Sequence, residues 1–207
     1  VAASMSSNPE WEAIRAELLT MSREDQDVRE ELARDGSLSD GYHPRMEEIH
    51  RRNGERLKRI VNARGWPGVS RVGPEAAEAA WLIVQHGIAA PDLMRRGLAA
   101  VTEAVPRGEA SPLHRAMLED RIRSFEGRGQ RFGTQFDWDA EGELSPLPLE
   151  DPAGVDARRG EIGLPPLAAD LRRRREAIAS STERPPADWE RRREMLEEWL
   201  RKVGWRR

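Results

Sequence analysis

Prolines divide this chain into a series of predicted helices. Proline is favoured at the first position of an α-helix, because its missing N–H group would have no partner there. Eight of the 14 prolines stand where an apolar pattern of helical spacing begins. Good N-cap residues directly precede three of them, namely Asn8, Ser111 and Asp151. The pattern predicts helices over residues 9–34, 44–64, 74–87, 91–105, 112–127, 152–160, 166–180 and 186–203.

One segment, residues 131–149, breaks the helical spacing. Large side chains alternate with small or polar ones from Phe132 to Trp138, which indicates a short strand. A turn and a second extended stretch follow, although Pro146 and Pro148 limit any hairpin to an edge or an irregular arm. We therefore expect a mainly α fold, a single-domain bundle of about seven or eight helices with a short β-hairpin or extended arm in this segment.

The domain organisation is expected to follow the same divisions. Residues 1–8 are expected to be a disordered or non-native N-terminus, residues 9–167 the helical core with the arm, and residues 168–207 amphipathic helices that pack on the core. Residues 137–156 contain seven acidic residues and no basic one, whereas residues 157–207 contain 14 basic and nine acidic residues. Either the acidic arm lies on the basic C-terminal helices, or the two are separate solvated surfaces.

The composition excludes several classes of function. The formal net charge of −3 is too small to indicate a nucleic acid or an anionic membrane surface as the partner. The chain has no cysteine, so disulfides and thiolate metal sites are impossible, which fits a cytoplasmic location. No stretch approaches the roughly 20 apolar residues of a membrane span, and no signal pattern begins the chain. We expect a cytoplasmic protein that binds neither nucleic acid nor membrane, and the oligomeric state stays open.

An aspartate interrupts the apolar face of the first predicted helix. Seven residues from Trp11 to Leu32 recur at spacings of three and four, so they share one helix face; six are apolar and the seventh is Asp25. A buried carboxylate is costly unless it is paired or hydrogen-bonded, so we expect a partner, and with it a site. Alternatively, Ser22 to Asp25 fits a capping box, and the helix would then break at Met21.

Three other predicted helices also place polar residues on inward faces. Asn53 lies on an apolar stripe, His86 continues an apolar face beside Gln85, and Asp120 precedes Arg121 on a third helix. In a bundle such side chains can converge on an interior pocket. Structural roles stay open for each: an interhelical hydrogen bond for Asn53, a favourable helix C-terminus for His86, and an ion pair for Asp120 and Arg121.

The remaining histidines form no recognisable metal-binding motif. His43, His50 and His114 share no HxxxH or HxxE spacing, so no metal site and no cofactor are predicted. The sequence leaves open whether His50 or His114 joins a metal site. The chain also lacks a nucleophile elbow, a phosphate-binding glycine loop and a dinucleotide fingerprint.

Several short motifs occur in an order that resembles a known family. They are Asp25-Gln26 with Arg29, Asn53, Gly65-Trp66-Pro67, Ala80–His86, Asp120-Arg121, Gln130, Gly133-Thr134-Gln135, Asp151-Pro152, Asp156 with Arg158-Arg159, and Gly163-Leu164. Together they resemble an uncharacterised bacterial family, domain of unknown function 6624, over about residues 25–167. The resemblance implies no reaction, because none is assigned to the family. The family often has an acidic residue where this chain has His50, three places before the matching asparagine.

The leading hypothesis is a cofactor-independent acid/base enzyme that acts on a small molecule or short peptide by hydrolysis, elimination, cyclisation or isomerisation. His86 would transfer the proton and Asp25 would orient it. The alternative is a non-catalytic binding or protein-interaction module in which the same residues form a structural hydrogen-bond network. The expected substrate-binding residues are Gln26, Arg29, Asn53, Gln85, Asp120, Arg121, Gln130, Thr134 and Gln135.

Overall fold

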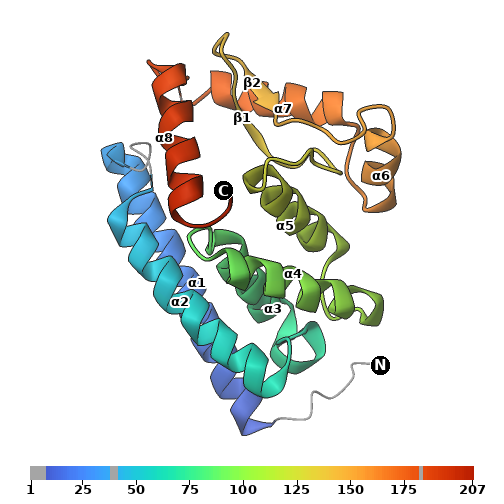
Figure 1. Ribbon diagram of the computed structural model, residues 1–207. Helices are drawn as coiled ribbons and strands as arrows, with labels where there is room; N and C mark the ends of the chain where they lie inside the picture. The colour runs from blue at the N-terminus through green and yellow to red at the C-terminus, as the bar shows by residue number, and fades with distance from the viewer. Residues whose placement is uncertain (1–7, 38–41, 182–183) are drawn as a thin grey trace. The chain divides into compact units, whose positions relative to one another are not determined.

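The structure is a computed structural model that describes residues 8–37, 42–181 and 184–207. Within these residues the chain forms eight α-helices, one short 3-10 helix and a two-stranded hairpin, which confirms the predicted mainly α fold (Figure 1). In chain order the elements are α1 (Pro9–Asp35), α2 (Pro44–Arg64), α3 (Val69–His86), α4 (Pro91–Ala104), η2 (Val105–Arg107), α5 (Pro112–Phe125), β1 (Phe136–Trp138), β2 (Leu144–Pro146), α6 (Val155–Glu161), α7 (Leu167–Ala179) and α8 (Trp189–Lys202).

The chain divides into two compact units. The first spans Val1–Ser111 and contains α1 to α4 with η2, and the second spans Pro112–Arg207 and contains the remaining elements. This boundary lies at the start of α5, whereas the sequence placed a division between residues 167 and 168. The two differ because α7 packs against β2 and α6 and so belongs to the second unit. Among the described residues, no helix has the length and hydropathy that a membrane span requires.

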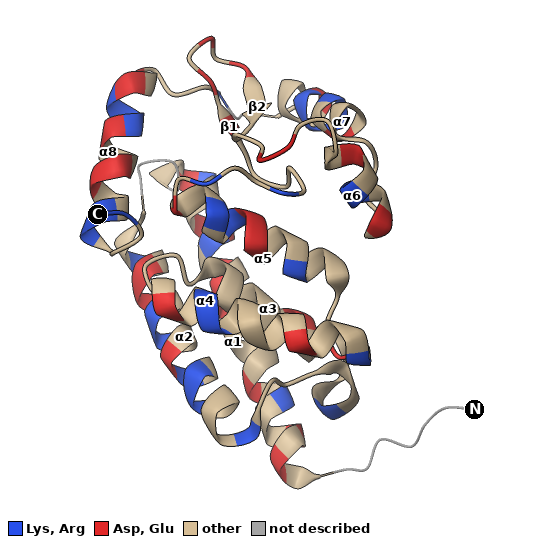
Figure 2. Ribbon diagram, turned by 45° about the vertical axis from the view of Figure 1, so that its right-hand side comes forward, with Lys and Arg blue, Asp and Glu red and all other residues tan. Residues whose placement is uncertain are grey.

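Ion pairs set α1 and α2 antiparallel in the first unit. Four glutamates spaced by seven residues along α1 pair with arginines that follow in reverse order along α2. Figure 2 shows the resulting mixture of acidic and basic residues on these helices. An exposed pair contributes only about 0–1 kcal/mol, so the ladder fixes register more than stability. The pairs are Glu10–Arg64, Glu17–Arg56, Glu24–Arg52 and Glu31–Arg45.

The core of the first unit includes the predicted apolar face of α1. Ile14, Leu18 and Leu32 on that face are buried, and so is Asp25. α1 runs unbroken through Met21, which excludes the capping-box alternative and leaves Asp25 in the middle of the helix. α3 contacts α1, α2 and α4, and most of its ribbon is tan in Figure 2, the colour of residues other than Lys, Arg, Asp and Glu. A largely buried third helix therefore faces the stripe that carries the aspartate.

Three helix starts differ by three or more residues from the prolines that predicted them, and α7 (Leu167–Ala179) begins one residue after Pro166. α3 begins at Val69, and Gly73 with a φ of 80° kinks it just before Pro74, a backbone angle that glycine adopts without a steric penalty. Pro74 thus starts the second segment of a longer helix. α8 begins at Trp189, three residues after the predicted start, because the side chain of Asp188 caps it. α6 likewise begins three residues later than residue 152, at residue 155.

The predicted extended arm forms a short antiparallel hairpin in the second unit. Phe136 lies opposite Pro146, and Trp138 lies opposite Leu144. Each strand is an edge of this two-stranded sheet, so a proline is tolerated in it. Residues 132–135, which the alternation also assigned to a strand, form a loop instead.

The acidic arm lies on the basic C-terminal helices, as one of the two predicted readings proposed. The guanidinium of Arg192 on α8 donates to both carboxylate oxygens of Asp137 at 2.9 Å. Arg175 on α7 donates to the carbonyl of Leu144 at 2.9 Å and pairs with Glu143 at 3.6 Å. These contacts tie the hairpin to both helices of the same unit.

Candidate functional site

Asp25, His50 and His86 meet in the first unit. They come from α1, α2 and α3, respectively. Asp25 Oδ2 lies 2.5 Å from His86 Nδ1, and Asp25 Oδ1 lies 3.1 Å from His50 Nε2. The ring centroids of the two histidines are 5.2 Å apart. The aspartate on the apolar face of α1 thus has the partner that its burial requires, and it has two of them.

The three side chains differ in their access to solvent. The side chain of Asp25 is 3% exposed, that of His50 is 9% exposed and that of His86 is 17% exposed. His86 is the last residue of α3, where the helix ends. The carboxylate is therefore shut away from water, and His86 is the member of the cluster that a ligand in solution reaches most easily.

Tyr42 extends the cluster beyond His50. Its hydroxyl oxygen lies 2.7 Å from His50 Nδ1, and the two rings stack with centroids 5.7 Å apart. Burial raises the pKa of Tyr42, and the negative charges of Glu47 and Asp25 raise it further. The hydroxyl therefore stays protonated at neutral pH. When it donates to Nδ1 of a neutral His50, the ring proton lies on Nε2 and faces Asp25.

The histidines keep Asp25 ionised. Burial alone raises the pKa of its carboxyl group, but the hydrogen bonds of His50 and His86, together with their positive charge when protonated, outweigh burial and hold this pKa well below its usual range. Among the described residues, these two histidines are the groups that form ion pairs with Asp25. The carboxylate thus acts as an acceptor between two imidazoles.

Acid is expected to destabilise the fold through Asp25. Its pKa is lower in the folded chain than the value of about 3.9 in an unfolded one. The stabilisation is therefore complete above about pH 4 and is lost as the pH falls further toward the folded pKa, with a slope of up to about 1.4 kcal/mol per pH unit. Urea denaturation of the full chain across this range measures the slope. Asp25→Asn is expected to show a shallower slope, and an equal slope in both proteins would contradict the assignment.

The other residues predicted for the site in the first unit lie on the same three helices as the cluster. Asn53 Nδ2 donates to the carbonyl oxygen of Met21 at 3.3 Å, which joins α2 to α1 and matches its structural alternative. Gln85 is buried and directly precedes the histidine that ends α3. Gln26 and Arg29 lie on the exposed side of α1, one and four residues after the aspartate.

The remaining predicted residues belong to the second unit, where they organise the loop of residues 130–135. Asp120 on α5 is buried and accepts hydrogen bonds from the backbone N–H groups of Arg131, Phe132 and Thr134 at 2.8–3.2 Å, and from the Thr134 hydroxyl at 2.9 Å. Burial raises the pKa of Asp120, and these hydrogen bonds offset only part of that effect.

A glutamine and an arginine complete the same loop. The amide nitrogen of Gln130 donates to the carbonyls of Gln135 and Leu147 at 3.0 and 2.9 Å, while its oxygen accepts from the Gln135 backbone at 2.6 Å. Arg121 Nε donates to Gln135 Oε1 at 3.0 Å. The polar atoms of Asp120 and Gln130 bind backbone groups of the loop, which favours a structural role for both, different from the ion pair considered for Asp120. The substrate-binding role predicted for this set stays a prediction.

Sequence reasoning missed His50 and Tyr42 as members of the cluster. His50 follows Met46 by four residues and precedes Asn53 by three, so the spacing that singled out Asn53 also places His50 on the inward side of α2. That signal could have found it. Tyr42 precedes the helix, and no periodicity marks it.

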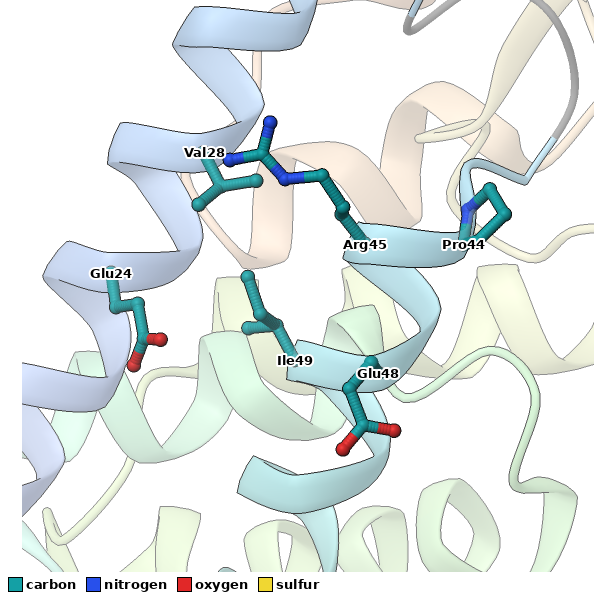
Figure 3. A pocket seen from close by; sticks show the side chains of 6 residues that line it. All are labelled: Glu24, Val28, Pro44, Arg45, Glu48 and Ile49. Atoms are coloured by element: carbon teal, nitrogen blue, oxygen red, sulfur yellow. The ribbon is translucent and has the colours of Figure 1, made fainter.

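A hollow of about 440 Å³ lies between α1 and α2 (Figure 3). Two of its lining residues, Glu24 and Ile49, directly precede Asp25 and His50. Its charged residues already form ion pairs, and we assign it no chemistry. The lining residues are Glu24, Val28, Pro44, Arg45, Glu48 and Ile49.

The motifs around the cluster belong to a recognised sequence family. A model described as a family of unknown function, DUF6624, matches residues 12–181. The chain belongs to this family. The match spans Asp25, His50 and His86 together with the loop of the second unit, and it confirms the resemblance seen in the sequence. Comparisons with curated proteins and with solved structures found no match.

Proposed function

We propose that the chain is an acid/base enzyme in which His86 transfers a proton and Asp25 orients the His86 imidazole. The observation that carries this proposal is the 2.5 Å contact between a carboxylate that is 3% exposed and an imidazole that is 17% exposed. A buried carboxylate at Nδ1 fixes the ring and stabilises its protonated form. The other ring nitrogen, Nε2, is the one that faces away from Asp25 and would exchange the proton with a substrate.

The neighbours of this pair support the same role. His50 occupies the second oxygen of Asp25, so the carboxylate is held from both sides and cannot rotate away from His86. Gln85, which is buried and directly precedes His86, would bind a neutral polar group of the substrate, and Arg29 would meet an anionic group. We propose a small molecule or short peptide as the substrate, in hydrolysis, elimination, cyclisation or isomerisation. A bacterial, cytoplasmic setting stays a prediction of the sequence.

A library screen tests the proposal. The purified full chain is incubated with a mixture of small metabolites and dipeptides, and mass spectrometry follows which compounds change. The wild-type chain is expected to convert at least one compound, and His86→Gln to convert it at least about 100-fold more slowly, because proton transfer by a positioned group contributes about 10²–10⁴-fold. His114→Gln is the matched control, since it removes a histidine of α5 in the other unit.

The outcomes separate the two function classes. Equal turnover in His86→Gln and wild type would contradict the proposed role of His86. If no compound is converted and His86→Gln mainly lowers the melting temperature, the residues form a structural network in a binding module. The loop of the second unit, in which Asp120 and Gln130 bind backbone groups, is the observation that favours this second class.

A further inference from the structure

The cluster in the first unit also has the composition and spacing of a metal site. Asp25, His50 and His86 each offer one ligand atom, and these atoms lie within 4.8 Å of one another. In a tetrahedral zinc site with bonds of about 2.0–2.1 Å, the ligand atoms lie about 3.3 Å apart. The two imidazoles lie against different oxygens of the Asp25 carboxylate, at 3.1 and 2.5 Å, so the three side chains already converge on one place. To admit an ion, the His86–Asp25 contact of 2.5 Å has to open to about 3.3 Å.

The charges of the cluster favour a cation. Asp25 is buried and ionised, and among the described residues its ion pairs are with histidines and not with lysine or arginine. A histidine neutralises a carboxylate only when it carries an extra proton. A divalent ion neutralises the carboxylate directly, and the imidazoles that bind it stay neutral. The site thus lacks a permanent cation of its own.

The surroundings of His50 match those of a metal ligand. Histidines that bind metals usually hydrogen-bond through the second ring nitrogen, which fixes the orientation of the ring. The Tyr42 hydroxyl oxygen lies 2.7 Å from Nδ1 of His50 and can accept a hydrogen bond from it; in that tautomer Nε2, which faces the carboxylate, carries the lone pair that binds an ion. His50 is in this way held in place by a residue outside the cluster, and His86 lies at the partly exposed edge of the cluster.

We propose that Asp25, His50 and His86 bind one divalent first-row transition-metal ion. Two imidazoles and one carboxylate suit zinc, iron or nickel better than magnesium or calcium. Three protein ligands leave a coordination position for water, as in catalytic rather than structural zinc sites. The ligands come from three helices, so no local motif spacing joins them in the sequence. Binding stands apart from the proposed proton transfer, and a bound ion would take His86 Nδ1 away from Asp25.

Calorimetry with Zn²⁺ as the probe tests this inference. The full chain is treated with a chelator, dialysed and titrated, and one saturable site per chain is expected. His50→Gln and His86→Gln are each expected to weaken binding by at least about 10-fold. His114→Gln, which removes a histidine outside the cluster, is expected to bind as the wild type does. Circular dichroism confirms that each variant is folded.

Several outcomes would overturn the proposal. They are the absence of a saturable site in the wild type, unchanged affinity in both cluster variants, or equal weakening in His114→Gln. If a cluster variant does not fold, the absorption spectrum of the wild-type chain loaded with Co²⁺ is measured in place of that variant. Co²⁺ bands that persist after Zn²⁺ is added would contradict a shared site. Turnover by a chelator-treated chain that binds no Zn²⁺ would overturn this inference and leave the proposed function standing. Zn²⁺ binding without any turnover would support this inference and contradict the proposed function.

Discussion

Asp25→Ala is expected to lower the free energy of unfolding by about 3–5 kcal/mol, the loss that follows when one partner of a buried ion pair is removed. The substitution deletes the acceptor that His50 and His86 share at 3.1 and 2.5 Å. Both rings then face a buried gap, and neither can be protonated there without a counter-charge. Urea denaturation of the full chain at neutral pH, followed by circular dichroism, measures the loss.

Asp27→Ala is the matched control for this variant. Asp27 lies two residues further along α1 and is exposed, so its removal is expected to change stability by less than about 0.5 kcal/mol. If the two variants lose the same stability, the histidines do not hold Asp25, and the candidate site loses its physical basis.

Arg159→Met is expected to destabilise the chain by about 3–5 kcal/mol as well, for a different reason. Arg159 on α6 is 0% exposed. Its guanidinium donates to the carbonyls of Pro165, Phe132 and Gly133 at 2.7–3.1 Å and to Asp170 Oδ2 at 2.9 Å. Methionine keeps much of the side-chain volume but donates no hydrogen bond, so two buried carbonyls, one part-buried carbonyl and a buried carboxylate lose a partner.

Arg172→Met provides the comparison for this second substitution. Arg172 lies on the exposed side of α7, where the same change is expected to cost less than about 0.5 kcal/mol. The same urea denaturation compares the two variants. A loss below about 1 kcal/mol for Arg159→Met would mean that water replaces the guanidinium, and the buried arginine would then not be what holds the loop of the second unit.

The prolines predicted helices well where they occupy the first turn. Pro9, Pro44, Pro91 and Pro112 each begin a helix as expected, because the missing N–H group has no partner to lose at that position. Pro186 does not, since the Asp188 side chain takes the capping role three residues before Arg191. A proline restricts where a helix can start, and the neighbouring capping residue decides the position.

The alternation of large and small residues predicted too much strand. Only Phe136–Trp138 of that stretch pairs with a second strand, whereas the residues just before it wrap around the Asp120 carboxylate. Four hydrogen-bond donors of the loop converge on the carboxylate of Asp120, which lies on α5. A local sequence pattern cannot predict such a contact between distant residues. Tertiary hydrogen bonds thus replaced the ladder that alternation alone would favour.

Periodicity found Asp25 and His86 but not the complete cluster. It shows which face of its own helix a residue occupies, and it does not show which residue of another helix lies opposite. The ladder of ion pairs between α1 and α2 sets that register. In this register Asn53 meets the backbone of Met21, and the carboxylate one turn further along α1 meets His50.

The sequence by itself determined that the chain is mainly helical and that one carboxylate on an apolar face needs a partner, because helix periodicity and the cost of burying a charge are local properties. Only the tertiary structure decided that the partners are His50 and His86, that Tyr42 joins them, and that Asp120 belongs to a separate loop network. Those choices depend on the register between helices and on contacts between distant residues, which the spacing within one helix cannot encode.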